Sequence, residues 1–261
     1  MAVSSTLNVR QQDIMKQVNK EGNVLIKDMA VECKVSEATI RRDLDELTAS
    51  GLIERIHGGA VRLSSTTFER YHSEKMKTML NEKRKIASYA ASLVENGDSI
   101  FLDSGTTTFF LAHELANHSD LTVITNNIDI AYSAQFSQTS TLIVTGGMRR
   151  DNYSVLIGNV AENTIKSFKV DKVFMGCDAI DPKDGIYNSN FLEIGVKKQI
   201  VLCGKKVILV TDSSKFHRQA LAKVCDLNEI DMIITDDDLE QNIAEEIKKI
   251  VPNTVCVTMV N

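Results

Sequence analysis

Residues 36–44 read Ser-Glu-Ala-Thr-Ile-Arg-Arg-Asp-Leu, and this stretch decides how the N-terminal part of the chain folds. Ser36 is a favourable N-cap, because its hydroxyl can accept a hydrogen bond from a free N–H group in the first helical turn. Ile40, Leu44 and Leu47 recur at helical spacing and form one apolar stripe. The opposite face carries two adjacent arginines, whose guanidinium groups can each donate two parallel hydrogen bonds to guanine or phosphate. The pattern predicts a helix that reads DNA.

The flanking segments predict a winged helix-turn-helix around this helix. Upstream, 10–21 and 27–33 have the pattern of two short helices. Downstream, 52–61 reads Leu-Ile-Glu-Arg-Ile-His-Gly-Gly-Ala-Val and predicts a β-hairpin wing, in which Gly58 and Gly59 permit the turn and a close approach to a sugar-phosphate chain. An ordinary surface helix with solvated arginines is the alternative, but the two preceding helices and the wing favour DNA binding.

Side chains of the wing divide into two expected sets. Leu52, Ile53 and Ile56 are expected to pack on the helices, and the outward-facing set is Arg55, His57 and Arg62. Taken over helix and wing, the residues expected to contact DNA are Ser36, Glu37, Ala38, Thr39, Arg41, Arg42, Arg55, His57 and Gly58.

Composition limits the possible classes of protein. The chain has 261 residues and a formal net charge of −5, so overall charge does not indicate a general binder of polyanions. Residues 1–62 hold nine Lys and Arg against nine Asp and Glu, so the remainder carries the whole −5. A neutral DNA-binding module is expected to have modest non-specific affinity and to gain from dimerisation.

The five cysteines are widely spaced, with no C-x-x-C motif, which argues against a disulfide framework and against a zinc site. No apolar run has the length of a membrane span, and the N-terminus has no signal-peptide pattern. We therefore expect a cytoplasmic protein with no metal and no cofactor.

The C-terminal part predicts an α/β domain. Seven short apolar segments alternate with amphipathic helices, which is typical of a mainly parallel central sheet. The predicted strands are 99–102, 121–125, 142–145, 172–175, 207–210, 232–235 and 254–257. In such sheets ligands bind at the carboxyl ends of the strands, so the residues that follow each strand are the candidates for a binding site.

Those strand ends carry residues suited to a sugar and a phosphate. Residues 103–108 read Asp-Ser-Gly-Thr-Thr-Thr before a helix, and a helix N-terminus offers free N–H groups to an anion. A capped helix that binds nothing is the alternative, and each single carboxylate or Lys215 could equally be a turn or loop residue. The residues expected to bind an effector are Asp103, Ser104, Gly105, Thr106, Thr107, Thr108, Asn126, Gly146, Gly147, Arg149, Asp178, Glu193, Lys197 and Lys215.

Both parts of the chain resemble one family. Thr39-Ile40-Arg41-Arg42-Asp43-Leu44 with His57-Gly58-Gly59-Ala60 is similar to the N-terminal signature of the DeoR family of bacterial transcription regulators. The segments 102–108, 125–127, 146–147 and 212–216 resemble the effector domain of that family. The resemblance implies a repressor that a phosphorylated sugar releases from DNA. Within the family, 176–181 and 210–216 look closest to repressors of N-acetylgalactosamine and galactosamine utilisation.

The effector domain is also similar in plan to ribose-5-phosphate isomerase, which supplies an alternative function. In that enzyme an Asp pair and a Glu act around the sugar phosphate, and Asp178, Asp181 and Glu193 follow the same order. The lysine-containing loop of the enzyme is replaced here by 184–190, which has no lysine, so we expect binding without catalysis and assign no catalytic residue. A relative of coenzyme A transferases, with Glu193 as nucleophile, is a third hypothesis that rests on analogy of plan alone.

These observations predict three regions: a winged helix-turn-helix over 1–62, a linker over 63–81 and an α/β domain that binds the effector over 82–261. The expected function is repression of a carbohydrate-utilisation operon. The expected partners are double-stranded operator DNA and a phosphorylated sugar, with no membrane partner. One recognition helix reads few bases, so a homo-oligomer, a dimer or tetramer, is expected.

Overall fold

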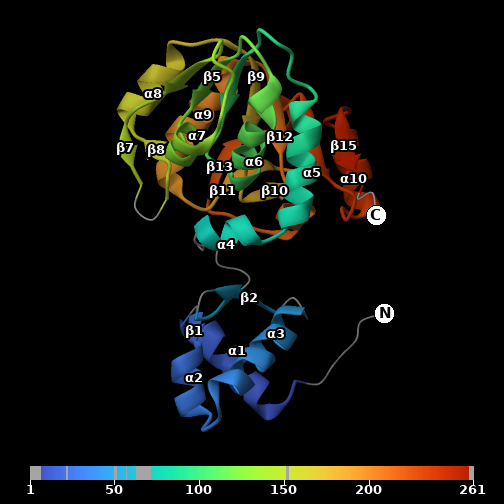
Figure 1. Ribbon diagram of the computed structural model, residues 1–261. Helices are drawn as coiled ribbons and strands as arrows, with labels where there is room; N and C mark the ends of the chain where they lie inside the picture. Colours follow the sequence, from blue (N-terminus) through green and yellow to red (C-terminus); the bar gives the residue numbers. More distant parts are fainter. Residues whose placement is uncertain are drawn as a thin grey trace. The chain divides into compact units, whose positions relative to one another are not determined.

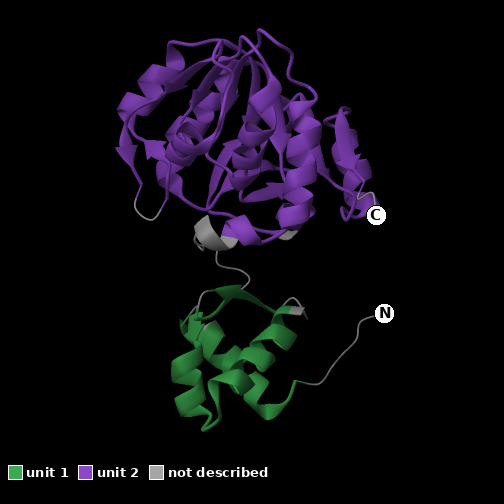
Figure 2. Cartoon of the chain, viewed as in Figure 1, with its two compact units in different colours: residues 1–70 green, residues 71–261 purple. Residues whose placement is uncertain are grey.

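The chain folds into two units, residues 1–70 and 71–261, which Figure 2 shows in different colours. The computed structural model describes residues 7–21, 23–49, 52–56, 58–62, 72–150 and 153–258. Each unit has its own apolar core.

The N-terminal unit is a winged helix-turn-helix, as the sequence predicts. Its elements are α1 (Val9–Glu21), β1 (Asn23–Leu25), α2 (Ile26–Glu32), α3 (Glu37–Ala49), β2 (Ile53–Ile56) and β3 (Gly59–Arg62) (Figure 1). The strands form an antiparallel sheet in the order β1-β3-β2. The apolar stripe of α3 is completely buried together with Ile14 and Val18 of α1, which confirms the helical phase expected for 36–47.

The wing differs from the expectation in three respects. It has a third strand, β1, and Leu52 is 38% exposed, so only Ile53 of the apolar trio is fully buried. Gly59 lies against β1: a Cβ atom there would stand 1.9 Å from the carbonyl oxygen of Val24. The close approach that this glycine permits in the structure is therefore to β1 of the chain itself. His57 and the side chain of Arg62 lie outside the described residues.

The C-terminal unit is built on a seven-stranded parallel sheet in the order β15-β14-β12-β9-β4-β5-β6. All seven strands were predicted from the sequence, within a few residues at their ends. The strands are β4 (Ser99–Leu102), β5 (Thr122–Thr125), β6 (Thr141–Val144), β9 (Val170–Met175), β12 (Gly204–Val210), β14 (Met232–Asp236) and β15 (Thr254–Val257).

Helices cover both faces of this sheet, because alternate strand residues point to opposite faces (Figure 1). Ile100 belongs to one core and Phe101 to the other. On the side of Ile100 lie α5 (Leu80–Ala91), α6 (Thr106–Glu114) and α7 (Ile128–Ser133). On the side of Phe101 lie α8 (Asn159–Lys166), α9 (Ile194–Cys203) and α10 (Gln241–Lys248).

Two small antiparallel sheets, which the sequence did not indicate, complete the unit. One contains β10 (Ala179–Asp181), β11 (Gly185–Asn188) and β13 (Ala222–Cys225), and the other pairs β7 (Met148–Arg149) with β8 (Leu156–Ile157). Short 3-10 helices cover Leu115–Asn117, Phe191–Glu193, Ser213–His217 and Leu227–Glu229. None of the helices in the described part of the chain has the length and apolarity needed to cross a bilayer.

Part of the expected linker is helical. Residues 63–71 lie outside the described residues, but α4 (His72–Lys77) is helical and α5 begins at Leu80 rather than at Glu82. The expectation failed because local periodicity over 72–77 is weak, whereas contacts from distant residues hold the helix. Lys83 donates hydrogen bonds to the carbonyl oxygens of Lys75 and Thr78. The C-terminal unit therefore includes α4.

Candidate functional site

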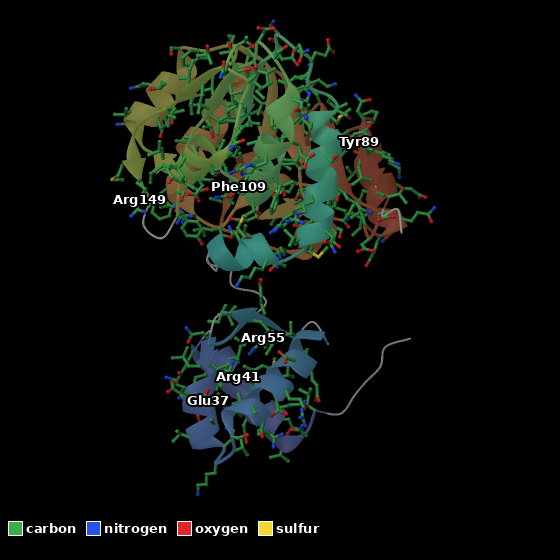
Figure 3. All side chains as sticks on the ribbon, viewed as in Figure 1. Glu37, Arg41, Arg55, Tyr89, Phe109 and Arg149 are labelled. Carbon is green, nitrogen blue, oxygen red and sulfur yellow. The ribbon has the colours of Figure 1, made fainter. Side chains whose placement is uncertain are left out.

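Helix α3 presents the polar face that the sequence assigned to DNA. Ser36 caps the helix, since its Oγ accepts a hydrogen bond from the Thr39 N–H group at 3.2 Å. Ala38, Arg41 and Arg42 are exposed on the same face. Arg41 forms an exposed ion pair with Glu37 at 3.1 Å, one turn away on the helix (Figure 3). An exposed pair of this kind is weak, so DNA phosphate can replace Glu37 as the partner of Arg41.

Arg55 has a structural partner in addition to its expected role at the wing. Its Nε lies 3.2 Å from Asp45 of α3, and its Nη1 donates to the carbonyl oxygen of Gly59 at 3.1 Å. Arg55 thus ties the wing to the recognition helix. Gly58 adopts a φ of +81°, which accounts for a glycine at this turn.

Sequence analysis missed the contact that anchors α3 to α1. Asp43 is only 3% exposed, and both of its carboxylate oxygens accept hydrogen bonds from the guanidinium group of Arg10. The pair raises the pKa of Arg10 above its ordinary value, mainly through the hydrogen bond to Asp43. Asp43 is therefore a buried anchor within the Arg-Arg-Asp sequence, and α1 supplies its counter-charge.

In the C-terminal unit, Asp103 and Lys197 join three elements at the carboxyl end of the sheet. Asp103 is fully buried after β4, and its Oδ2 accepts hydrogen bonds from Lys197 Nζ at 2.6 Å and from the Gly176 N–H group at 3.0 Å. Burial alone would lower the pKa of Lys197, but the charges of Asp103 and Glu193 raise it above its ordinary value. Two predicted site residues, Asp103 and Lys197, thus connect the ends of β4 and β9 with α9.

The loop that follows Asp103 leads directly into α6. Gly105 is the N-cap residue of α6 and has no side chain that could accept a hydrogen bond from the first turn. The N–H groups at the start of α6 are therefore open to another acceptor. Thr108 Oγ1 hydrogen-bonds to the carbonyl oxygens of Asp103 and Gly105, which makes its hydroxyl a brace for the loop. A Cβ atom at Gly105 would stand 3.6 Å from the Cα of Gly176, so this loop and the end of β9 are in contact.

Basic side chains gather beside the end of β9. Asp178 Oδ1 forms an ion pair with Lys75 of α4 at 2.9 Å, and Asp178 Oδ2 accepts from the Ser189 N–H group at 3.0 Å. Burial would raise the pKa of Asp178, but the charges of Lys75 and Lys215 hold it below its ordinary value. For Lys215, burial lowers the pKa and the Asp212 carboxylate opposes that shift.

Lys83 and Arg218 act electrostatically on the same residues. We call the four cations together the basic cluster: Lys75, Lys83, Lys215 and Arg218. The charges of two carboxylates, Asp178 and Asp212, act on the lysines of this cluster. Burial lowers the pKa of Lys83 to about 8. Only Lys215 and Asp178 were predicted from the sequence, because Lys75 and Lys83 lie on helices and not after a strand.

The arginine that pairs with Glu193 is Arg150, the neighbour of the predicted site residue Arg149. Arg149 is exposed on β7 (Figure 3), whereas Arg150 is 7% exposed and its Nε lies 2.9 Å from Glu193 Oε1. Arg150 also stacks on the Tyr153 ring at 3.5 Å from its centroid, and Asn188 donates to the other oxygen of Glu193. Met148 and Arg149, which form β7, are both exposed, and Arg150 follows the strand.

Amides and glycines at the ends of β5 and β6 have mixed roles. Asn126 is 1% exposed and its Oδ1 has no hydrogen-bond partner among the described residues, which leaves an acceptor for a ligand or water. Gly146 and Gly147 adopt φ values of +70° and +116°, and a Cβ atom on Gly147 would stand 2.7 Å from the Ile157 carbonyl oxygen. The glycine pair therefore serves the β7 turn, and nothing in the structure assigns it to a ligand.

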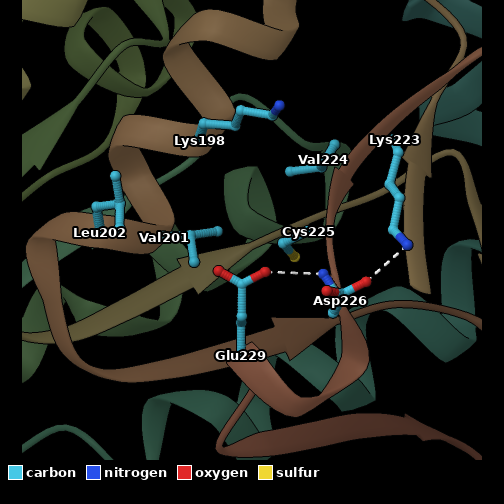
Figure 4. Close-up of a pocket in the computed structure, with 8 residues that line it drawn as sticks. All are labelled: Lys198, Val201, Leu202, Lys223, Val224, Cys225, Asp226 and Glu229. Atoms are coloured by element: carbon cyan, nitrogen blue, oxygen red, sulfur yellow. Dashed lines mark hydrogen bonds and ion pairs between the residues drawn. The ribbon is translucent and has the colours of Figure 1, made fainter. Parts of the chain in front are cut away.

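A separate surface pocket lies between α9 and β13 (Figure 4). Lys223 pairs with the Asp226 carboxylate at 2.6 Å, and Glu229 accepts a hydrogen bond from the Asp226 backbone N–H group at 2.8 Å. None of the predicted effector residues lines it.

Comparison with known proteins identifies both units. Residues 10–66 match the family model described as the DeoR-like helix-turn-helix domain, and residues 78–237 match the DeoR C terminal sensor domain. The chain belongs to the DeoR family. It is therefore a DNA-binding transcriptional regulator and not an enzyme, with α3 and the wing in the helix-turn-helix domain and the basic cluster in or beside the sensor domain.

DeoR relatives match over most of their length. The chain is 34% identical over 242 residues to the putative aga operon transcriptional repressor of Escherichia coli O157:H7, covering 92% of this chain and 90% of that protein. It is 34% identical over 227 residues to the glycerol-3-phosphate regulon repressor of Escherichia coli strain K12, covering 87% and 90%. It is 35% identical over 237 residues to a lactose phosphotransferase system repressor of Staphylococcus epidermidis, covering 89% and 93%.

Among solved structures, ribose 5-phosphate isomerase A from Methanocaldococcus jannaschii matches with a TM-score of 0.39 and 17% identity. The match covers 53% of this chain and 55% of the isomerase.

Proposed function

We propose that this DeoR regulator represses a carbohydrate-utilisation operon and leaves its operator when a phosphorylated sugar binds at the carboxyl end of the sheet. The observation that carries the proposal is the basic cluster, in which the described residues include four cations and two carboxylates. A phosphate monoester carries between one and two negative charges at neutral pH and is attracted to such a group of cations. The start of α6 offers N–H groups to the same anion. The names of the relatives, which include a glycerol-3-phosphate regulon repressor, support a phosphorylated effector.

The sugar part of the effector would lie over Asn126 and the Asp103 loop. The free acceptor of Asn126 suits a hydroxyl group. On DNA, two copies of the chain would place two α3 helices on repeated half-sites, so we propose a homo-oligomer that acts in the cytoplasm.

A thermal-shift screen of the full chain tests this function. The panel contains hexose and pentose phosphates, each beside its unphosphorylated sugar. A ligand at 100 times its Kd stabilises the folded state by about 2.7 kcal/mol, which raises Tm by about 5 °C or more. We expect a shift with at least one sugar phosphate and none with its parent sugar. Equal shifts with both members of a pair would contradict a phosphate site.

Each of the single variants Arg41→Ala and Arg42→Ala should weaken operator binding. The expected loss is about 1–3 kcal/mol if the arginine forms a bidentate contact with guanine. Both side chains are exposed, so the fold should persist. The measurement is fluorescence anisotropy with a duplex selected by the wild-type chain from a random library. Lys16→Ala, on the exposed face of α1, is the control. Wild-type affinity in both arginine variants would remove α3 from DNA recognition.

Affinity for a phosphorylated effector should fall about tenfold between pH 7 and pH 9, because Lys83 has a pKa of about 8 and loses its positive charge across this range. The second pKa of a phosphate monoester is near 6 and contributes little there. Calorimetry at pH 8 in two buffers of different ionisation enthalpy should detect the uptake of about half a proton. Lys83→Gln should bind more weakly and lose the pH dependence, and an unchanged pH profile in that variant would exclude Lys83.

The chain should not interconvert aldose and ketose phosphates. An isomerase needs a free carboxylate base, whereas the Glu193 carboxylate is paired with Arg150 and bonded to Asn188. In a coupled assay of the full chain with ribose 5-phosphate and hexose 6-phosphates we expect no turnover above background. Turnover on the order of 1 s⁻¹, as in ordinary enzymes, would show a catalytic activity that this geometry does not explain.

A further inference from the structure

Helix α4 is the first described element after the DNA-binding unit, and one of its lysines forms an ion pair with the effector domain. Lys75 Nζ lies 2.9 Å from Asp178 Oδ1 and 5.6 Å from the centroid of the Tyr153 ring. Its side chain is 19% exposed, so it reaches into the domain from a helix that leads directly to residues 63–71. Figure 1 shows α4 at the edge of the effector domain, beside the start of α5.

The main chain of α4 is held by the same group of charges. Lys83 Nζ donates to the carbonyl oxygens of Lys75 and Thr78, and Lys83 is only 3% exposed. Both the side chain and the carbonyl group of Lys75 are thus tied to the basic cluster. A change in the charge balance of the cluster acts on α4 at two points.

Asp178 can release Lys75 without losing all of its partners. Its second oxygen keeps the Ser189 N–H group, and the charge of Lys215 also acts on it. The exchange of one Lys75 partner for another therefore does not leave a buried carboxylate uncompensated, which is the usual large cost of breaking a buried ion pair. An anion with two negative charges, placed among four cations, is a stronger partner for Lys75 than one carboxylate.

We propose that Lys75 is an anion-binding residue of the effector site and that the phosphate of the effector competes with Asp178 for it. The inference rests on the proposed function and states how effector binding is transmitted to the DNA-binding unit. With DNA bound and no effector, Lys75 pairs with Asp178. When phosphate binds, Lys75 moves to it, and α4 changes its position on the domain. The DNA-binding unit is linked to α4 through 63–71, so the two ligands become coupled.

Inorganic phosphate is the probe for the competition, since it has no hydroxyl-bearing carbon that Asp178 could bind. Its affinity for the full chain is measured by thermal shift against sodium chloride of equal ionic strength. Lys75→Met should weaken phosphate binding about tenfold, and Lys75→Arg should restore most of it. Asp178→Asn should strengthen it, because the competitor is neutralised while Ser189 keeps an acceptor. In the double variant that gain should disappear, because it requires Lys75.

Lys77→Met is the matched control, since Lys77 is on the same helix and exposed. It should bind phosphate as the wild type does. Equal affinity in Lys75→Met and the wild type, an Asp178→Asn gain that persists without Lys75, or no phosphate binding by the wild type would each overturn the inference. If either of the first two outcomes is found and a sugar phosphate still releases the operator, the inference about Lys75 fails but the proposed function stands. Failure of the inference can therefore be distinguished from failure of the proposed function.

Coupling to DNA is the second readout. For each variant we compare the Kd of the sugar phosphate with the largest thermal shift, in the presence and absence of the selected operator duplex. The wild type should show at least a fivefold difference, within the usual range for coupled sites. Lys75→Met should reduce the difference to less than twofold. Full coupling in Lys75→Met would contradict a role for this lysine in transmission.

Discussion

Gly105→Asp should fold, bind operator and fail to respond to the effector, which is the phenotype of a super-repressor. Gly105 has a φ of −73° and is the N-cap of α6, a position that Asp occupies readily. The new Cβ atom would stand 3.3 Å from Thr108 Oγ1, a contact that a small shift of the threonine can relieve. The carboxylate would occupy the N–H groups at the start of α6 and repel phosphate. We expect effector affinity to fall on the order of 100-fold.

Operator occupancy is measured by anisotropy with and without the sugar phosphate found in the screen. Gly105→Asn is the matched control, because it has the same shape and capping ability without the charge, and it should retain most of the response. If Gly105→Asp releases DNA at the wild-type effector concentration, the phosphate is held by the basic cluster without the α6 N-terminus.

Arg10→Leu should strongly destabilise the DNA-binding unit while leaving the stability of the effector domain unchanged. The substitution leaves Asp43, 3% exposed, without its counter-charge, and removal of one partner of a buried pair costs about 3–5 kcal/mol. Because Arg10 is itself 32% exposed, we expect about 2–3 kcal/mol, a large part of the stability of a unit of this size. Calorimetry should show the transition of the first unit shifted to low temperature and that of the second unchanged.

Two further variants test whether the loss of stability comes from the buried Asp43 carboxylate. Arg41→Leu removes the exposed partner of Glu37 and should change stability by less than about 0.5 kcal/mol. The double variant Arg10→Leu, Asp43→Leu should recover much of the loss, because an apolar pair needs no counter-charge. Wild-type melting of Arg10→Leu would show that Asp43 is solvated and that the pair does not anchor α3.

The central sheet could be predicted because buried parallel strands read as short continuous apolar runs. Two examples of such runs are Val207-Ile-Leu-Val and Ser99-Ile-Phe-Leu. All seven of the predicted strands lie in the observed sheet. The recognition helix was equally clear, since Ile40, Leu44 and Leu47 fix its phase. Strands β10, β11 and β13 were missed because they are short and partly polar, and because β11 pairs with a strand about 37 residues away in the chain.

The candidate site was predicted where it follows strands and missed where helices supply it. Asp103, Asp178 and Lys215 come directly after strands or in the loops that follow them, and the structure places them at one end of the sheet. Lys75 and Lys83 join them only through tertiary contacts that no local pattern encodes. Arg150 pairs with Glu193 through a tertiary contact that no local pattern indicates.

The most direct measurement is operator occupancy during titration with a phosphorylated sugar and, separately, with the same sugar lacking phosphate. The full chain is held on a labelled selected duplex at fixed salt, because salt alone changes DNA affinity. Lys215→Gln is run in parallel, since it removes one cation of the basic cluster at the end of a strand. We predict release by the phosphorylated sugar alone, and release at clearly higher concentration in Lys215→Gln. Release by the unphosphorylated sugar at the same concentration, or no release by any sugar phosphate in the panel, would contradict a phosphate-sensing repressor.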